Sequence, residues 1–555
     1  MPRATSRPAS PLAAATQPPR RILRRTPDAL SLVADPLIAC ARGLGASDAE
    51  AGLERPADAS HGDYATTLAL RLAKPLRQSP RAIADALAEA ARASEWVDSA
   101  EIAGPGFVNL RLSPAWYAEA VRQASAEAFG GGTVEQPMRI NVEYVSANPT
   151  GMLPVSAGRN AAYGDCLARI FAFVGHDVTR EYYFNDSGSQ MERFGRSLRA
   201  RARGEEVPED GYPGEYLIEL ARRTGLPPDA SVDEFQRAGA ELMFASIRDT
   251  LERFRVHMDV YTNEVDLHAS GGVERAIERA RAGGHLFEQD GATWLRTTEF
   301  GDDKDRVIVK ADGSATYFAG DLAYLVDKLE REFGLAVYVL GADHHGYQLR
   351  LKAAAQALGY EQGRIEIALY QMVNLVEDGV QQRMSKRRGA IVLLDELVEA
   401  IGIDATRFFL VQRSHDQAVD IDLALATEES SENPVYYVQY AHARIASIIR
   451  KAGALAETAA ASAEHVPERS EATLIRALSD FPGVCRAAAE LRAPHRLVGY
   501  ARELAGDFHA FYRDCIVLDE EQPARSSARL ALCAATQAVL ARSLDLVGVS
   551  APAEM

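Results

Sequence analysis

The sequence has few cysteines, short apolar runs and no excess of positive charge. Its cysteines lack the paired spacing of a zinc site or a disulfide framework, which favours a reducing, cytoplasmic compartment. The apolar runs, such as 391–394, are far shorter than the ~20 residues that span a bilayer, so we expect no membrane segment. A net charge of −17 argues against nonspecific coating of nucleic acid, which needs clustered Lys and Arg. The five cysteines are Cys40, Cys166, Cys485, Cys515 and Cys533.

The 555 residues are enough for three or four domains at about 150 residues each. Residues 1–27 are rich in Arg and Pro and contain no acidic residue, which is typical of a disordered tail. Three roles fit this composition: a transit peptide, a nucleic-acid arm, or an extension without a role.

The remaining chain divides into three predicted domains. Residues 28–115 combine helical patterns with a strand-like segment and predict a small α+β domain. Residues 138–425 alternate strand and helix signals, which predicts an α/β fold with a mostly parallel sheet and an insertion at about 190–297. Residues 433–555 carry an almost wholly helical pattern and predict an all-α domain.

A strand followed by a tight turn and a helix is predicted at 140–174. Apolar and polar residues alternate from Ile140 to Tyr144, and apolar residues recur at helical spacing after Tyr163. The turn at 148–151 permits a sharp reversal, and the small residues 156–158 leave the first helical amides open to an anion. The pattern therefore predicts a phosphate-binding turn, although an ordinary strand-to-helix crossing without a ligand has the same outline.

A second crossing follows the apolar strand VYVL, where the chain continues as GADHHGY. Polar side chains at the carboxyl end of a parallel strand line the usual ligand crevice, which makes Asp343, His344 and His345 candidate site residues. A metal is the competing explanation. Adjacent histidines on a turn rarely face one ion, and no further Cys/His cluster supports a metal, so we predict no protein-held metal site.

A basic segment, QQRMSKRRG, occupies residues 381–389. Such a segment is usually a solvated loop. The alternative is a mobile loop that closes on a triphosphate, because Lys386 can supply positive charge to a leaving pyrophosphate.

Residues 146–159, SANPTGMLPVSAGR, resemble the first signature of class I aminoacyl-tRNA synthetases in its arginyl form, which usually reads SANPTGPLHVGHGR. Pro154 and Ala157 stand where that family has its two signature histidines, and Ser156 replaces the glycine between them. Two signatures in the right order are a stronger indication than either alone.

Further segments extend the resemblance from about residue 28 to residue 555. MSK at 384–386 is similar to the second class I signature, with Arg383 in place of its usual first lysine. GADHHG resembles the stretch that lines the ATP and amino-acid pocket. The segments 54–76 and 104–112 resemble the additional N-terminal domain of arginyl-tRNA synthetases, and the C-terminal helices resemble their anticodon-binding domain.

The resemblance implies a Rossmann-like catalytic domain and an arginine-tRNA ligase, a monomer that uses ATP with Mg²⁺, L-arginine and tRNA(Arg). It also implies site residues. The catalytic candidates are Lys386, Ser156 and Arg159. The ATP-binding candidates are Thr150, Gly151, Pro154, Val155, Ala157, Gly158, Gly341, Asp343, His344, His345, Met384 and Ser385. The arginine-binding candidates are Glu143, Ser146, Asn148, Tyr317 and Asp321. The tRNA-binding candidates are Tyr436, Tyr440, His442 and Arg444.

The arginine pocket can also be argued from charge, because carboxylates match a planar guanidinium. Glu143 lies in a predicted strand, where an acidic side chain is costly unless it is paired. Asp321 follows Tyr317 by four residues, which puts both on one face of a helix. The bland alternative is a salt bridge that stabilises the fold, with Arg306 or Lys310 as the partner.

Helix 434–451 interleaves aromatic residues with His442, Arg444 and other basic residues. Aromatic rings stack on unpaired bases and Arg holds the backbone, as in the recognition of single-stranded RNA loops. About half of the tyrosines are nevertheless expected in the core. A second function fits the altered first signature: a paralogue that binds tRNA or arginine without efficient adenylation.

Overall fold

A five-stranded parallel sheet forms the centre of the protein. The computed structural model describes residues 28–186, 188–377, 380–381 and 392–555. The sheet has the order β12-β11-β5-β6-β7, and every neighbouring pair is parallel, which confirms the expected α/β architecture. Its strands are β5 (Arg139–Glu143), β6 (Asp177–Phe184), β7 (Val260–Asn263), β11 (Leu335–Gly341) and β12 (Ile365–Tyr370).

The strand order reverses between β5 and β11. The chain adds β6 and β7 on one side of β5 and returns later to add β11 and β12 on the other side. Ligands of such sheets bind outside the carboxyl ends of the strands at this switch point.

Helix α5 (Val155–Val174) connects β5 to β6 and packs closely against the sheet. A side chain at Gly164 would overlap the ring of Tyr144, so the helix can approach the strand only because this residue is glycine. The helix ends at Gly175, whose φ of 117° belongs to the left-handed conformation that glycine adopts without steric cost.

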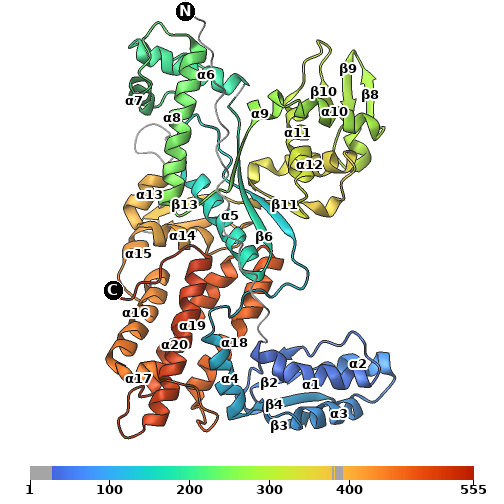
Figure 1. Ribbon diagram of the computed structural model, residues 1–555, viewed down its shortest axis with the longest axis vertical. Coiled ribbons are helices and arrows are strands. Elements are labelled where there is room, and N and C mark those ends of the chain that lie inside the picture. Colours follow the sequence, from blue (N-terminus) through green and yellow to red (C-terminus); the bar gives the residue numbers. More distant parts are fainter. Residues whose placement is uncertain (1–27, 187, 378–379, 382–391) are drawn as a thin grey trace, which may run out of the picture.

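Two excursions leave this sheet (Figure 1). The first holds α6 (Gly188–Ala202), α7 (Tyr216–Arg223) and α8 (Val232–Arg253). The second holds α9 (Glu264–Ala269), α10 (Gly272–Ala282) and the antiparallel strands β8 (Leu286–Gln289), β9 (Ala292–Leu295) and β10 (Arg306–Val309). The expected single insertion at 190–297 is therefore corrected, because β7 lies inside that range and pairs with β6. The strand VYTN is too short and too evenly half-buried to give an alternating pattern.

The second excursion has its own apolar core, which includes residues of α11 (Tyr317–Glu330) and α12 (His345–Ala357). Helix α11 leads into β11, and α12 connects β11 to β12. These two helices therefore lie beside the switch point, on the side of the second excursion.

A small three-stranded sheet follows the central one. Its strand β13 (Val373–Glu377) pairs in parallel with β15 (Val419–Asp422) and antiparallel with β14 (Val380–Gln381). Between β14 and β15 lie α13 (Leu394–Ile401) and α14 (Ile403–Val411), and α15 (Leu423–Thr427) follows β15.

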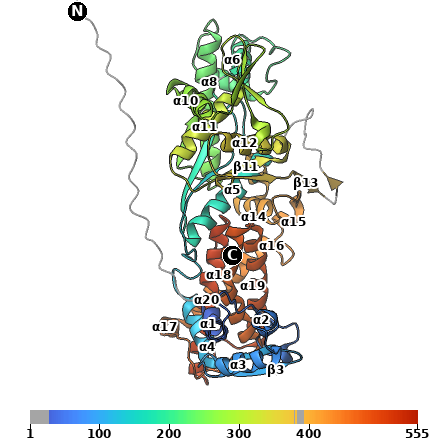
Figure 2. The ribbon, with the colours of Figure 1, turned by 90° about the vertical axis from the view of Figure 1, so that its right-hand side faces the viewer.

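The N-terminal part of the described chain and its C-terminal helices lie together in the lower half of the molecule (Figure 1 and Figure 2). The N-terminal part is a four-stranded antiparallel sheet, β1-β2-β4-β3, with helices packed on it, as expected for a small α+β domain. Its elements are α1 (Ala29–Gly43), β1 (Leu53–Glu54), β2 (Tyr64–Thr66), α2 (Leu68–Leu76), α3 (Pro80–Arg92), β3 (Val97–Ala103) and β4 (Phe107–Leu112).

The C-terminal part is helical, as expected, and α4 (Pro114–Ala124) joins the N-terminal part to it. Its helices are α16 (Pro434–Ala452), α17 (Ala454–Glu457), α18 (Arg469–Glu490), α19 (His495–Asp514) and α20 (Pro523–Leu546). Among the residues that the structure describes, no helix is long and apolar enough to cross a membrane.

Arg407 of α14 ties three parts of the chain together. Its side chain is fully buried, and its guanidinium donates to the Asp165 carboxylate at 2.5 Å and to the carbonyls of Phe254 and Val547 at 2.8 and 3.1 Å. These contacts join α5, the end of the first excursion and the C-terminal segment. The packing leaves no room for a side chain at Gly548.

We expect Arg407→Met to lower the free energy of unfolding by about 3 kcal/mol, because the change leaves two buried carbonyls without this donor and the buried Asp165 carboxylate with Arg169 as its remaining cation. Urea unfolding followed by circular dichroism measures this. The matched control is Arg222→Met, which removes an exposed ion pair with Glu219 and should leave the transition unchanged. Equal stability of Arg407→Met and the parent would contradict the assigned role.

Candidate active site

The carboxyl end of β5 is held in a strained conformation. Val145 and Ser146 have φ values of 67° and 43°, in the left-handed region that non-glycine residues rarely enter. Asn160 of α5 supports this turn, because its Oδ1 accepts the Val145 amide at 2.6 Å and its Nδ2 donates to the carbonyl of Val339 in β11 at 2.9 Å. Asn160 thus joins both strands of the switch point. No spacing in the sequence singled Asn160 out, because α5 also carries Arg159, Asp165 and Arg169 among its apolar residues.

The first turn of α5 offers two backbone amides to a ligand. The Val155 amide donates to the Val392 carbonyl at 3.0 Å, and the Gly158 amide donates to the Pro154 carbonyl at 3.1 Å. The expectation that all amides of 156–158 are open is therefore corrected for Gly158, which begins the helical hydrogen bonding. The amides of Ser156 and Ala157 are the first-turn donors without a helical acceptor, and the Ser156 side chain is exposed.

The chain that follows the second signature lies against the first signature. Residues 392–394 run antiparallel to 153–155, and the Leu394 amide donates to the Leu153 carbonyl at 2.8 Å. A Cβ at Gly158 would lie 2.6 Å from Leu394 Cδ1, so this contact requires glycine. The predicted residues Lys386, Met384 and Ser385 lie outside the described residues, but the chain that follows them is anchored at the start of α5.

The guanidinium of Arg159 is committed to backbone carbonyls. Its Nη1 donates to Gln371 and Met372 at 2.7 and 3.1 Å, and its Nη2 donates to Ser414 and Gln417 at 3.0 and 2.7 Å. Burial lowers the pKa of Arg159 to about 10. The contacts hold the junction of β12 and β13 and the 414–417 turn against α5. We therefore assign Arg159 to positioning, in place of the predicted catalytic role.

The remaining turn residues contact the first excursion. The Asn148 Nδ2 donates to Gln190 Oε1 at 2.7 Å, and the Thr150 carbonyl accepts the hydroxyl of Tyr216 at 2.5 Å. The turn that follows β5 is therefore held by α6 and α7. Gly151 lies in the same turn, next to the Tyr216 ring.

The second crossing presents polar groups at the same edge. Gly341 ends β11, and Asp343, His344 and His345 follow with exposed side chains; His344 Nε2 lies 3.7 Å from the Asp343 carboxylate. One turn further along α12, Tyr347 is hydrogen-bonded to Asp321, and burial raises the pKa of this phenol. The second crossing is therefore connected through Tyr347 to Asp321, an arginine-binding residue of the predicted pocket.

One stripe of α11 lines that pocket. Tyr317, Asp321, Tyr324 and Lys328 follow one another at helical spacing, from the two-thirds exposed Tyr317 to the fully buried Lys328. Burial raises the pKa of Asp321 to about 7, Tyr347 and Arg350 oppose this, and the neighbouring carboxylates Glu264 and Glu143 add to it. The pocket therefore concentrates negative charge.

Glu264 is a site residue that the sequence reading missed. It begins α9, is 5% exposed, and lies against α11, where a Cβ on Gly320 would be 3.3 Å from its Oε1. The Tyr183 phenol lies near four carboxylates: burial raises its pKa, and Glu264, Asp321, Glu143 and Asp186 raise it further. No spacing rule links Glu264 to Asp321, because the two helices meet only in the folded chain.

The expected alternative partners of Glu143 are engaged elsewhere or not in contact with it. Arg306 pairs with Asp302 at 2.8 Å, whereas Glu143 pairs with Lys328 at 2.5 Å. Ser146 Oγ also donates to Glu143, at 3.1 Å. Glu143 is thus both a partner in a buried ion pair and a wall of the pocket.

The predicted tRNA-binding residues divide into two groups. Tyr436 and Tyr440 stack at 5.9 Å between ring centroids, and the Arg444 guanidinium lies 4.8 Å from the Tyr440 ring, next to a hollow of about 470 Å³. His442 is buried, with its Nδ1 2.8 Å from the carbonyl of Pro552, and burial lowers its pKa. The structure therefore removes His442 from the exposed face of α16.

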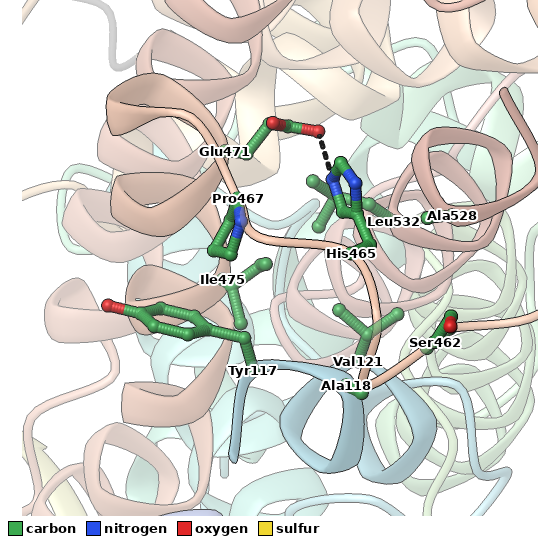
Figure 3. A pocket seen from close by; sticks show the side chains of 11 residues that line it. Tyr117, Ala118, Val121, Ser462, His465, Pro467, Glu471, Ile475, Ala528 and Leu532 are labelled. Carbon is green, nitrogen blue, oxygen red and sulfur yellow. Dashed lines mark hydrogen bonds and ion pairs between the residues drawn. The ribbon is translucent and has the colours of Figure 1, made fainter. Parts of the chain in front are cut away.

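A small cavity lies between α4 and the C-terminal helices, with His465 and Glu471 among its lining residues (Figure 3), and an acidic cluster adjoins it. Glu468, Glu471 and Cys515 form the one group of three close potential metal ligands that the described residues bring together. Arg529 donates to both carboxylates, at 2.6 and 2.9 Å, and His465 lies 3.0 Å from Glu471. The adjoining cavity of about 20 Å³ has room for one water. The cluster is therefore an internal ion-pair network.

Comparisons with known proteins agree with this geometry. Three family models match: the "Arginyl tRNA synthetase N terminal domain" at residues 28–112, "tRNA synthetases class I (R), catalytic domain" at 229–447, and the "DALR anticodon binding domain" at 438–555. The fold and the site define a class I aminoacyl-tRNA synthetase. The catalytic-domain match begins after the altered first signature.

Solved structures show to which family within this class the chain belongs. A putative arginyl-tRNA synthetase from Campylobacter jejuni is 31% identical, covering 80% of this chain and 100% of that one, with a TM-score of 0.75. The arginyl-tRNA synthetase of Thermus thermophilus is 24% identical (94% and 99% covered), and that of Plasmodium falciparum is 15% identical (96% and 100% covered), each with a TM-score of 0.75. The chain belongs to the arginyl-tRNA synthetase family, and it is an aminoacyl-tRNA ligase.

The pKa of Asp321 predicts a pH dependence of arginine binding. A cationic guanidinium favours the ionised carboxylate, so the affinity for arginine should rise as pH increases from 6 to 8, through the pKa of about 7. Asp321→Asn should weaken binding about tenfold or more at pH 8 and abolish this rise. Isothermal titration calorimetry at pH 6, 7 and 8 measures both effects.

The raised pKa of Asp321 also predicts that the variant Asp321→Asn is more stable than the parent. A carboxyl whose pKa is raised on folding loses stability as pH rises through the folded value, so Asp321→Asn should unfold at a higher temperature than the parent at pH 8. Asp327→Asn, on the same helix but outside the pocket, is the control and should leave arginine binding unchanged. If arginine binding by the parent does not change with pH, the role assigned to Asp321 is contradicted.

Proposed function

We propose that the protein ligates L-arginine to tRNA(Arg) in two steps, with ATP and its Mg²⁺. In the first step the α-carboxylate of arginine attacks the α-phosphorus of ATP, and pyrophosphate leaves. In the second step the terminal ribose hydroxyl of tRNA attacks the carbonyl of the adenylate, and AMP leaves. Positioning and charge stabilisation supply most of the rate in such reactions.

The observation that carries this proposal is the acidic pocket beside the start of α5. Three buried or half-buried carboxylates, Glu143, Asp321 and Glu264, surround Tyr183 at the switch point of the sheet. Carboxylates match a guanidinium better than any neutral amino-acid side chain. The adjacent helix start supplies amides suited to a phosphate.

The arrangement fixes the direction in which arginine enters. Its α-carboxylate has to reach a phosphate at Ser156 and Ala157, so the α-ammonium lies near the turn after β5, at the polar groups of Ser146 and Asn148. The guanidinium then extends toward Glu143, Asp321 and Glu264. Tyr317 and Asn148 border this path, at the mouth of the pocket and in the turn after β5.

The phosphates are bound without the two signature histidines. The amides of Ser156 and Ala157 and the Ser156 hydroxyl contact the triphosphate, and Lys386, with Met384 and Ser385, closes over it. The exposed groups of the second crossing, from Gly341 to His345, form the other wall of the nucleotide site. Loss of one preorganised donor typically costs about 10²–10³ in rate, and two losses need not add.

The other parts of the chain contact tRNA. Residues 433–555 bind the anticodon through the face of α16 that carries Tyr436, Tyr440 and Arg444, where stacking and positive charge occur together. Residues 28–115 contact the outer corner of tRNA, and residues 138–425 carry the reaction. The protein works as a cytoplasmic monomer.

Charging of tRNA(Arg) with labelled arginine tests this proposal directly. We expect robust charging by the parent and a loss of about 10²–10³ in kcat for Lys386→Ala, with arginine binding retained, because the lysine acts on the developing charge. Lys304→Ala removes an exposed lysine of the second excursion. This variant is the control and should charge tRNA(Arg) at the parental rate.

The negative outcomes are distinct. A parent that binds arginine and tRNA(Arg) but forms no adenylate would be a binding paralogue whose altered signature ended catalysis. A parent that binds neither ligand would contradict the proposal as a whole.

A further inference from the structure

The turn between α18 and α19 holds an arginine in a conformation that usually belongs to glycine. Arg492 follows the end of α18 with a φ of 55°, in the left-handed region. A side chain at this position after a helix costs free energy, which is why glycine is common there. The turn is otherwise ordinary, since the Ala493 amide donates to the Ala488 carbonyl at 2.9 Å. The strained arginine therefore points to a task for its side chain.

The Arg492 guanidinium pairs with the central sheet. Its Nε and Nη2 donate to the two carboxylate oxygens of Glu366 on β12, at 2.9 and 2.8 Å. The two side chains are only 20% and 34% exposed. Its Nη1 turns back and donates to the carbonyls of Ala489 and Glu490 at the end of α18. A bidentate pair fixes orientation as well as distance, so the guanidinium ties this helix end firmly to the strand.

Arg492 also contacts α5. The Tyr163 hydroxyl donates to the Arg492 carbonyl at 2.9 Å, and the guanidinium carbon lies 4.9 Å from the centroid of the Phe171 ring. Tyr163 is buried. One residue of the helical C-terminal part therefore touches both a strand and a helix of the catalytic part.

Both of these partners lead to the nucleotide site. Glu366 lies on the strand whose last residue, Tyr370, pairs with Gly341 at the second crossing. Tyr163 lies one helical turn after Asn160, which holds the strained end of β5. A displacement at Arg492 would therefore reach the site through α5 and through β12.

The helical part has a second attachment, on the opposite face of α5. There Arg407 donates to Asp165 of α5 and to the carbonyl of Val547, just beyond the end of α20. Asp165 lies about 200° around the helix from Tyr163, at about 100° per residue. The helix that begins the nucleotide site is thus held between the two attachments. A bundle attached at one place can rotate about it, whereas two attachments fix its direction.

We infer that Arg492 is a positioning residue for the transfer step: together with Arg407 it fixes the direction of the anticodon-binding domain relative to α5 and β12, and so brings the 3′ end of a bound tRNA to the adenylate. The inference rests on the proposed function, because it assumes that one tRNA contacts both residues 433–555 and the site. A small rotation at the α18–α19 turn becomes a larger displacement over the length of the tRNA.

This role predicts an effect on rate and not on binding. The arginine pocket lies in the catalytic part, and the aromatic face of α16 lies in the helical part, so loss of the Arg492–Glu366 pair leaves each binding surface intact. What is lost is the arrangement in which the tRNA end meets the adenylate. The kcat of charging should therefore fall, while the KM for tRNA and the affinity for arginine stay parental.

The test measures charging of tRNA(Arg) by the full-length protein at saturating ATP and arginine, with the tRNA concentration varied. The variants are Arg492→Gly, Arg492→Lys, Glu366→Ala and the double variant Arg492→Gly/Glu366→Ala. Glycine suits a φ of 55°, so Arg492→Gly removes the side chain without disturbing the turn. The matched control is Arg496→Met, which removes an exposed arginine from the first turn of α19. Isothermal titration calorimetry gives the arginine affinity of each variant.

We expect kcat to fall about tenfold or more in Arg492→Gly and in Glu366→Ala, since small misplacements of reacting groups have effects of this order. The double variant should be no slower than the slower single variant, because both changes remove the same pair. Arg492→Lys keeps the charge but cannot engage both oxygens, so its kcat should be intermediate. Arg496→Met should keep the parental kcat.

The inference is overturned if Arg492→Gly and Glu366→Ala both keep the parental kcat, or if Arg496→Met loses as much as they do. A loss of arginine affinity equal to the loss of kcat also overturns it, because the site itself would then be disturbed. Should Arg492→Gly fail to fold, Glu366→Ala alone decides. Failure of the proposed function is distinct from these outcomes, because in that case the parent itself does not charge tRNA(Arg).

Discussion

The site depends on the burial of negative charge at the carboxyl edge of a parallel sheet. Glu143 and Glu181 lie side by side on β5 and β6, and two cations at the end of α11, Lys328 and Arg331, neutralise them. Because both cations come from the same helix, the stripe of α11 that carries Asp321 is held over the sheet. The position of the pocket and its charge therefore follow from the same ion pairs.

The nucleotide side depends on α5. Asn160 ties the strained end of β5 to β11, and Arg159 holds the 371–372 junction and the 414–417 turn. The return of the chain at 392–394 is paired with 153–155. One helix thus fixes three segments that surround the proposed phosphate site, which explains how its geometry persists although both signature histidines are replaced.

Local patterns predicted the parts of the fold that depend on local periodicity. The strand, turn and helix at 140–174 and the pairing of Tyr317 with Asp321 on one helix face were visible as spacing. Lys328 and Glu264 were not, because their partners are 185 and 57 residues away in the chain and no repeat connects them. Strand β7 is too short to give an alternating pattern in the sequence. The burial of His442 could not be predicted either, because it depends on a contact with the C-terminal segment.

The central claim is that one edge of the sheet holds the guanidinium, the α-ammonium and the phosphate of an arginyl adenylate at once. A crystal structure with a nonhydrolysable arginyl-adenylate analogue tests it most directly. The account predicts the guanidinium at the carboxylates Glu143, Asp321 and Glu264, and the phosphate at the amides of Ser156 and Ala157. A guanidinium away from these carboxylates, or a phosphate away from the start of α5, would contradict it.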